Sequence, residues 1–195
     1  MSDLVLFHSV YGLRPAVHAA AERIRALGIR VHTPDLYRGW TSETVAEGRA
    51  YRDRIGIPVL VERARSDVAA LGLNPGACYA GFSMGARLAQ MFAGTDPATG
   101  GLVLLHGASD VDDDASFGYP IQLHVAEHDE FAPVDEIADW VKAVEAKGCS
   151  PEVFWYDGGH LYTDPELPDY DAESAELTWQ RVEAFLTGLR TAGGG

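Results

Sequence analysis

The sequence predicts an α/β protein: a three-layer sandwich in which helices cover both faces of a mostly parallel sheet of about six strands. Short, continuously apolar runs alternate with longer stretches of helical periodicity along the chain. No repeat or Pro/Ser-rich linker interrupts this alternation, and 47% hydrophobic with 23% charged residues is the balance of a globular chain. Strands that alternate with helices imply right-handed crossovers, and therefore parallel strands covered on both sides.

The chain opens on a strand, Leu4–Phe7, which is short, apolar and followed by turn residues. A helix begins at Pro15, a residue suited to the first helical turn, and Gly28 ends it. Ile29–Thr33 is the next predicted strand, and Pro34 follows it.

The middle of the chain is predicted to hold two helices, a strand and a third helix. A polar helical stretch covers residues 42–55, and residues 58–71 carry their apolar side chains on one helical face. Ala77–Phe82 has the pattern of a buried strand, and Met84–Ala93 has that of a helix.

The last part begins with two strands, Leu102–His106 and Ile121–Ala126, joined by a loop rich in aspartate. The helix Val134–Lys147, the strand Glu152–Tyr156 and the helix Ala172–Leu189 complete the predicted order. Because ligands of such sheets bind at the carboxyl ends of the strands, we expect functional residues immediately after strands.

We expect one domain over residues 1–191 and a flexible tail over residues 192–195, whose sequence is Ala-Gly-Gly-Gly. The net charge of −14 is unevenly placed, because residues 1–108 carry +2 and residues 109–195 carry −16. An acidic half repels phosphate backbones and anionic membrane surfaces. We therefore expect neither a nucleic-acid partner nor a membrane partner.

The remaining composition favours a cytoplasmic protein. No apolar stretch reaches the roughly 20 residues of a membrane span, and the first residues show no basic start or leader cleavage site. Two cysteines, Cys78 and Cys149, are too few for a disulfide framework. No metal-ligand spacing, phosphate loop or dinucleotide-binding motif is visible, so we expect no cofactor and no metal.

The residues Gly81-Phe82-Ser83-Met84-Gly85 match the motif G-x-S-x-G between a strand and a helix. A serine in such a sharp turn has a strained backbone and small neighbours, and its hydroxyl stands above the start of the helix. There the backbone N–H of Met84 and the helix dipole can stabilise an oxyanion. The alternative is an ordinary helix start, but the strand before and the helix after favour a nucleophile.

A serine nucleophile needs a base, and the base needs a carboxylate that orients it. In this architecture the chain order is Ser, acid, His. Asp129 follows the strand Ile121–Ala126, and His160 follows the strand that ends at Tyr156. Both fall at the same sheet edge as Ser83, so we predict a catalytic triad of these three residues.

The predicted acid and base have alternatives. Asp129 could instead cap the helix that follows Pro133, and the adjacent Glu127 and His128 could take the role of the acid. His160 could be a surface-loop histidine.

Two other histidines, His8 and His106, end predicted strands and could line the site. Neither follows the strand that is expected to carry the base. The histidines inside predicted elements have the pattern of structural residues: His18, His32 and His124.

Two further stretches are distinctive: His8–Gly12 after the first strand and Thr33–Gly39, T-P-D-L-Y-R-G, after the second. With the elbow and the predicted triad, they make the chain resemble the dienelactone hydrolase family over nearly its whole length. The first stretch matches the family's oxyanion loop, and the second is similar to its A-P-D-L-Y segment. The resemblance implies an α/β-hydrolase fold and an oxyanion hole formed by the backbone N–H groups of Met84 and Val10.

The chain departs from the family pattern at positions that bear on the substrate. Members that open dienelactones carry cysteine at the elbow and an activating glutamate in the first loop, where this chain has Ser83 and Ser9. Where the family has a carboxylate-binding arginine after the histidine, Asp164 adds an anion instead. The sequence leaves open which of three arginines faces the site: Arg49, Arg52 or Arg54.

The sequence therefore favours a serine-dependent carboxylic-ester hydrolase that acts on small, neutral, short-acyl esters or lactones through an acyl-enzyme. Little sequence remains for a cap, so we expect a minimal or absent lid and a shallow pocket. Aromatic side chains are expected to rim that pocket and bind substrate: Tyr11, Tyr37, Trp40, Phe131 and Tyr162. The expected partner is a small-molecule ester, and the expected state is a monomer or a homodimer.

Other functions stay open on the sequence alone. The same triad could serve a dienelactone hydrolase-like lactonase, a thioesterase, a peptidase or an acyltransferase, because function depends on the site rather than on the fold. A non-catalytic binding module on a hydrolase scaffold is the alternative from another class. The complete set of Ser, Asp and His positions argues against it.

Overall fold

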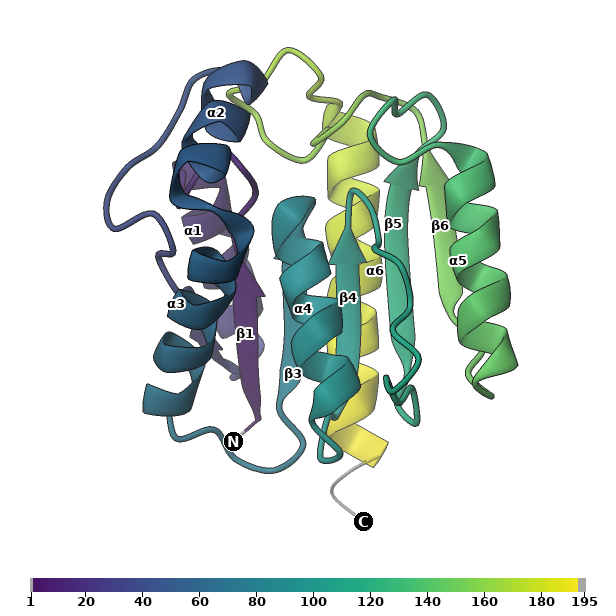
Figure 1. The fold of residues 1–195 in the computed structure, drawn as a ribbon. Coiled ribbons are helices and arrows are strands. Elements are labelled where there is room, and N and C mark those ends of the chain that lie inside the picture. The colour runs from purple at the N-terminus through teal and green to yellow at the C-terminus, as the bar shows by residue number, and fades with distance from the viewer. Residues whose placement is uncertain (1, 193–195) are drawn as a thin grey trace.

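Six parallel strands form the central sheet of the computed structural model, which describes residues 2–192 (Figure 1). Their order across the sheet is β2-β1-β3-β4-β5-β6, and every neighbouring pair is parallel. The strands are β1 (Asp3–Phe7), β2 (Arg30–His32), β3 (Cys78–Phe82), β4 (Gly101–Leu105), β5 (Ile121–Ala126) and β6 (Glu152–Tyr156). The predicted α/β class and parallel sheet are confirmed.

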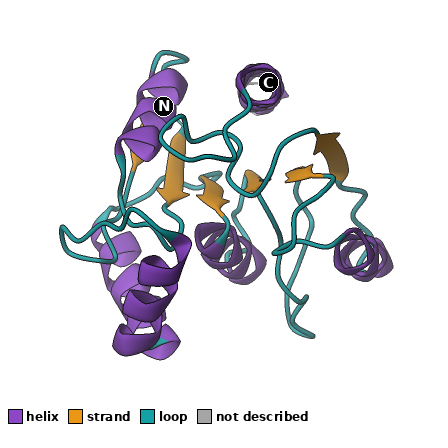
Figure 2. Cartoon of the chain, turned by 90° about the horizontal axis from the view of Figure 1, so that it is seen from above, coloured by secondary structure: helices purple, strands orange, loops and turns teal. Residues whose placement is uncertain are grey.

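Helices cover both faces of this sheet and complete the three layers (Figure 2). They are α1 (Pro15–Arg25), α2 (Val45–Ile55), α3 (Ile57–Ala70), α4 (Met84–Thr95), α5 (Val134–Ala146) and α6 (Ala172–Ala192). One apolar core lies between the sheet and α1 with α6, and the other lies between the sheet and α3, α4 and α5. Along β1, Val5 packs into one core and Leu4 into the other, because strand side chains alternate between faces.

Local signals set the ends of the elements. The Thr44 hydroxyl accepts the Glu47 N–H at 3.2 Å and caps α2, so this helix begins at Val45 rather than at the predicted residue 42. β4 ends at Leu105 rather than at the predicted His106, because His106 has a left-handed φ of 65°. The connection from β4 to β5, residues 106–120, contains neither helix nor strand.

The last residues of the chain bear on the predicted tail. Ala192 ends α6, and residues 193–195 of the tail expected over 192–195 lie outside the described residues. No helix within residues 2–192 combines the length and the apolar character that a bilayer crossing requires.

The sheet has one topological switch point, between β1 and β3. The chain leaves β1 toward β2 on one side and returns to β3 on the other side, with Phe7 and Gly81 in register at the carboxyl ends. Ligands of open α/β sheets bind at such a point, beyond the carboxyl ends of the strands. The loop after β1 and the turn after β3 meet there.

Candidate active site

Ser83 stands in the turn between β3 and α4, with φ of 51° and ψ of −109°. This is a strained conformation for a residue other than glycine. Two glycines make the turn sterically possible, because a Cβ on Gly81 would lie 2.1 Å from Gly85 O and a Cβ on Gly85 would lie 2.3 Å from Phe7 O. The start of α4 therefore packs directly against the end of β1.

His160 and Asp129 converge on Ser83 from the loops after β6 and β5. The Ser83 hydroxyl and His160 Nε2 are 2.8 Å apart, and His160 Nδ1 lies 2.6 Å from Asp129 Oδ2. The Asp129 side chain is fully buried and the imidazole is 9% exposed. A neutral imidazole that donates from Nδ1 to the carboxylate keeps Nε2 as an acceptor for the serine proton.

The alternatives for the acid and the base do not fit this geometry. Asp129 does not cap α5, since the cap position is Pro133 and no side chain bonds there. Its second oxygen instead accepts the Phe131 N–H at 2.8 Å. Glu127 and His128 are exposed.

The loop after β1 is held in place by His8. Its Nε2 accepts the Leu36 N–H at 3.1 Å, so the proton sits on Nδ1, which donates to Ser9 O at 2.7 Å. Burial lowers the pKa of His8 and keeps the ring neutral. Because a trans peptide is planar, fixing the Ser9 carbonyl also fixes the Val10 N–H, which points the opposite way.

The two backbone N–H groups predicted to form the oxyanion hole are those of Val10 and Met84. Within residues 2–192, neither the Val10 N–H nor the Met84 N–H donates to a protein acceptor. Met84 is the first residue of α4, where N–H groups have no partner inside the helix and the macrodipole is positive. Both groups can therefore stabilise negative charge.

His106 lies near the triad, and its contacts could not be predicted from the sequence. It is completely buried, its ring centroid lies 6.2 Å from that of His160, and its Nε2 lies 2.7 Å from Thr163 Oγ1. Burial lowers the pKa of His106 well below its ordinary value, so this ring stays neutral. A histidine followed by Gly107 at the end of a strand was the only signal for it.

Two residues of the predicted aromatic rim, Phe131 and Trp40, are at least partly exposed. Phe131 is 40% exposed, and its ring centroid lies 4.8 Å from that of His160. Trp40 is half-buried and stacks on Tyr51, with 3.8 Å between the two ring centroids.

The other three aromatic residues are buried, so the expectation that they rim an open pocket needs correction. Tyr162 is fully buried, and its hydroxyl is within hydrogen-bond distance, 2.8 Å, of Thr178 Oγ1 inside the molecule. Tyr37 is 1% exposed, and its hydroxyl lies 3.7 Å from Met84 Sδ. Tyr11 is 8% exposed.

Asp164, the anion at the place of the family's arginine, is neutralised by a residue from another loop. Arg14 donates through Nε to Asp164 Oδ2 at 3.0 Å, through Nη2 to Glu166 at 3.0 Å and through Nη1 to Ser42 O at 2.9 Å. Arg14 follows the oxyanion loop, and Asp164 follows the base. This guanidinium therefore ties together the two loops that build the site.

Of the three arginines left open by the sequence, Arg49 contacts an aromatic ring that packs against the triad. Its guanidinium carbon is 5.8 Å from the centroid of the Phe131 ring, which packs on His160. The other two have partners elsewhere, Arg52 with Asp53 and Arg54 over the Tyr51 ring.

Cys78 is a second type of nucleophile, and it lies in β3, the strand before the turn at Ser83. It is buried in β3, and burial raises the pKa of its thiol to about 12, so it stays protonated. Within residues 2–192, no group of three or more His, Cys, Asp or Glu side chains could hold a metal ion.

Comparison with known protein families gives a match to the dienelactone hydrolase family over residues 2–189. No curated protein matches the sequence significantly.

Solved structures share the fold at low identity. A dienelactone hydrolase-like promiscuous phosphotriesterase from metagenomic libraries has a TM-score of 0.80 and 18% identity, over 97% of this chain and 87% of its own. Esterase 2 of Thermogutta terrifontis, phosphonylated by sarin, has a TM-score of 0.67 and 14% identity, over 96% and 84%. A phospholipase/carboxylesterase from Dyadobacter fermentans has a TM-score of 0.61 and 16% identity, over 92% and 88%. These structures confirm the predicted α/β-hydrolase sandwich.

Proposed function

Because the chain belongs to the dienelactone hydrolase family and is an ester-bond hydrolase, we propose that it cleaves small, neutral, short-acyl esters or lactones with Ser83 as nucleophile. The observation that carries this proposal is the hydrogen-bonded chain from Ser83 through His160 to Asp129, at 2.8 and 2.6 Å. A weak nucleophile, a neutral base and a buried orienting carboxylate are what nucleophilic acyl transfer requires.

In the acylation step, Ser83 Oγ attacks the carbonyl carbon while His160 Nε2 takes the hydroxyl proton. The carbonyl electron pair moves to oxygen, and the resulting oxyanion accepts hydrogen bonds from the Met84 and Val10 N–H groups. The carbonyl reforms, the bond to the alcohol oxygen breaks, and the imidazolium gives its proton to that oxygen. Asp129 stabilises the imidazolium in between.

Deacylation repeats the sequence with water. His160 takes a proton from water, whose oxygen adds to the acyl carbon, and the same two N–H groups bind the second oxyanion. Collapse of this intermediate breaks the bond to Ser83 Oγ, which recovers its proton from His160. The carboxylic acid is released and the free enzyme is regenerated.

The charges around the site support a neutral substrate. Asp164 is 8% exposed and already paired with Arg14, so the loop after the base offers no cation to a substrate carboxylate. A serine nucleophile activated by His160 also has no need of a glutamate at the position of Ser9.

Arg49 supports a second candidate, a lactonase for anionic substrates such as dienelactones. Its guanidinium stands over the ring of Phe131, beside the base. We expect Arg49→Gln to leave the hydrolysis of a neutral lactone unchanged, with Arg54→Gln as the matched control. If the wild type instead prefers a carboxylated lactone and Arg49→Gln alone loses that preference, the second candidate replaces the first.

The direct test of the proposal is hydrolysis of p-nitrophenyl acetate by Ser83→Ala. Loss of a triad member costs on the order of 10⁴-fold in kcat. The control is Ser66→Ala, which changes an exposed serine of α3. Equal rates for wild type and Ser83→Ala would remove Ser83 from the mechanism.

A further inference from the structure

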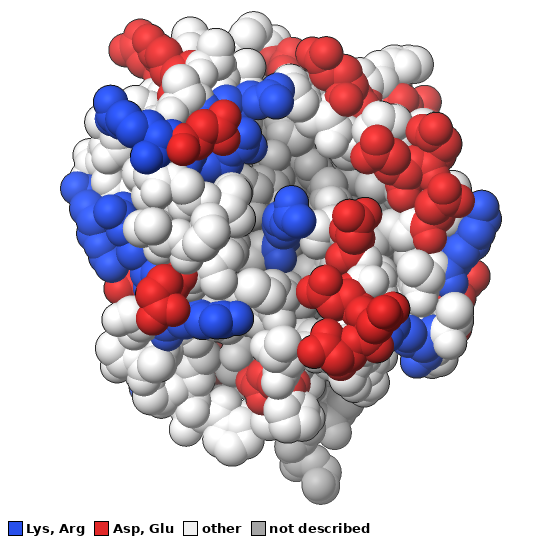
Figure 3. Space-filling model, in the orientation of Figure 1, with Lys and Arg blue, Asp and Glu red and all other residues white. Residues whose placement is uncertain are grey.

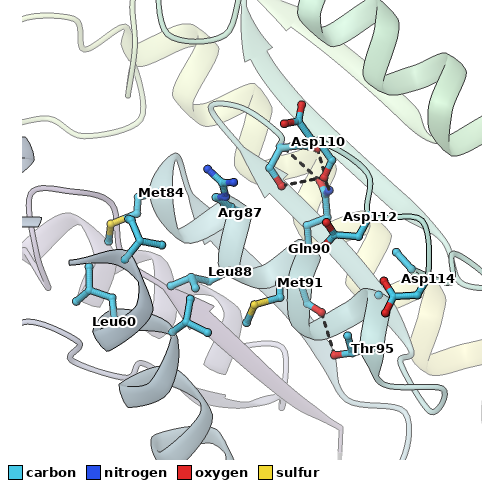
Figure 4. Close-up of a pocket in the computed structure, with 15 residues that line it drawn as sticks. Leu60, Met84, Arg87, Leu88, Gln90, Met91, Thr95, Asp110, Asp112 and Asp114 are labelled. Atoms are coloured by element: carbon cyan, nitrogen blue, oxygen red, sulfur yellow. Dashed lines mark hydrogen bonds between the residues drawn. The ribbon is translucent and has the colours of Figure 1, made fainter. Parts of the chain in front are cut away.

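A groove with a volume of about 300 Å³ runs along the outer face of α4 (Figure 4). One wall is the start of α3, and the other is the loop between β4 and β5. The α4 residues in it share one helical face, and the α3 residues are all apolar. Together the main lining residues are Ile57, Leu60, Val61, Met84, Leu88 and Met91.

The groove begins at Met84. Met84 follows Ser83 and supplies a predicted oxyanion-hole N–H, while its thioether lines the groove with the Tyr37 hydroxyl 3.7 Å away from the sulfur. From Met84 the groove follows α4 to Thr95, about 16 Å at 1.5 Å per residue. A chain that leaves the reacting carbonyl can therefore lie down along α4.

Hydrogen bonds hold the loop wall in place. The Gln90 amide donates to Ser109 O at 2.9 Å and to Asp110 O at 3.0 Å, and its oxygen accepts the Trp140 indole N–H at 2.9 Å. Near the far end of the groove, the Ser116 N–H donates to the Gly94 carbonyl of α4 at 3.0 Å. The groove is thus formed without a ligand, as small-molecule sites usually are.

The charge of the groove selects among apolar ligands. The floor of the groove is uncharged. Its loop wall carries three carboxylates, Asp110, Asp112 and Asp114, and the one cation among the lining residues is Arg87 of α4. Figure 3 shows the face of the molecule that carries α4, and acidic side chains gather on the right half of that face. A net anionic rim repels a chain that ends in a carboxylate.

We propose that this groove binds the apolar arm of the ester substrate, an unbranched and uncharged hydrocarbon chain on its alcohol side, opposite the short acyl group. The inference rests on the proposed function and extends it, since it names the substrate as an ester with one long apolar arm. The volume lies at the lower limit for small-molecule sites. An α-helix of a protein partner, about 10 Å wide or more, needs a larger volume than about 300 Å³.

The test compares two series of esters, one with a fixed alcohol and growing acyl chain and one with a fixed acetyl group and growing alcohol. In the alcohol series kcat/KM rises about fourfold per methylene, the equivalent of ~0.8 kcal/mol, until the groove is full, whereas the acyl series does not rise. A flat response in the alcohol series, or a rise in the acyl series alone, overturns the inference.

Two valines of α3 provide a matched pair of variants. Val61 lines the groove, whereas Val59 is 46% exposed and does not. Val61→Trp should lower the preference for octyl over methyl chains by tenfold or more, and Val59→Trp should leave it unchanged. Thr95→Trp, at the exposed far end, should affect only the longest chains. Equal effects of both valine variants contradict the inference.

Binding can be measured without catalysis through the methionine methyl groups. The chain has three methionines, and two of them, Met84 and Met91, line the groove. Octan-1-ol should shift both methyl resonances saturably in wild type and Val59→Trp, but not in Val61→Trp. An alcohol with a terminal carboxylate should bind more weakly than octan-1-ol. This difference should become smaller at high salt, because salt screens the repulsion by the acidic rim.

These readouts separate the two proposals. Saturable shifts without ester hydrolysis would overturn the proposed function and keep the groove. Hydrolysis without shifts or chain preference would keep the function and overturn the groove. Methyl shifts that depend on protein concentration alone would assign the groove to a second copy of the chain, and would overturn the inference as well.

Discussion

His8 shows how one buried side chain can set the geometry of a site it does not enter. The ring accepts the Leu36 N–H and donates to Ser9 O, so the peptide between Ser9 and Val10 has one orientation. A neutral ring is required, because a protonated Nε2 would face a second donor. Burial lowers the pKa of His8 and ensures that state.

We expect His8→Phe to reduce kcat for p-nitrophenyl acetate by about 10- to 100-fold, because the Val10 N–H loses its fixed direction toward the oxyanion. KM should change little, since the ground-state carbonyl carries less charge than the transition state. Steady-state kinetics, with circular dichroism as a check on folding, measure the effect. An unchanged kcat in a folded variant would contradict this role.

At the scale of elements, Arg14 joins two loops that are far apart in the sequence. It follows the oxyanion loop and binds Asp164 and Glu166 in the loop after His160. The side chains of Arg14 and Asp164 are only 10% and 11% exposed. Removal of one partner leaves the other as a buried charge without compensation.

Arg14→Met should therefore lower the free energy of unfolding by about 3–5 kcal/mol. The double variant with Asp164→Asn should recover part of that loss, because it removes the stranded carboxylate. Urea unfolding of the single and double variants measures both quantities. Additive losses in the double variant would show that the two residues are not coupled.

Features of the elements that depend on neighbouring residues could be predicted from the sequence. The turn at Ser83 could be predicted because two glycines, a strand and a helix adjoin it, and Asp129 and His160 could be placed because each follows a strand. Tyr162 could not be placed, since its burial depends on the turn at Leu161, which has a left-handed φ of 63°. The α4 groove was also out of reach, because its width depends on two segments distant in sequence.

For the whole molecule, Asp3 links the strands at the edge opposite the site. Its fully buried carboxylate bonds to Arg30 and His32 of β2 and to Asn74 before β3. The Arg30 guanidinium holds the pKa of Asp3 well below its ordinary value, although burial acts in the opposite direction.

A carboxyl whose pKa is lower in the folded state stabilises the fold above its unfolded pKa of about 3.9, and this contribution disappears as the pH falls. We expect Asp3→Asn to be less stable than wild type at pH 7, with a difference that shrinks between about pH 5 and pH 2. Thermal unfolding across this pH range measures the difference. A constant difference would show that Asp3 does not titrate with folding.

The central claim is that Ser83 is the nucleophile activated by His160. Intact-mass and peptide analysis after treatment with a fluorophosphonate tests it most directly. The account predicts one adduct on Ser83 in the wild type, none in Ser83→Ala and slow labelling in His160→Ala. A wild type that forms no adduct, or forms it on another residue while losing its activity, would contradict the account and favour a binding module on a hydrolase scaffold.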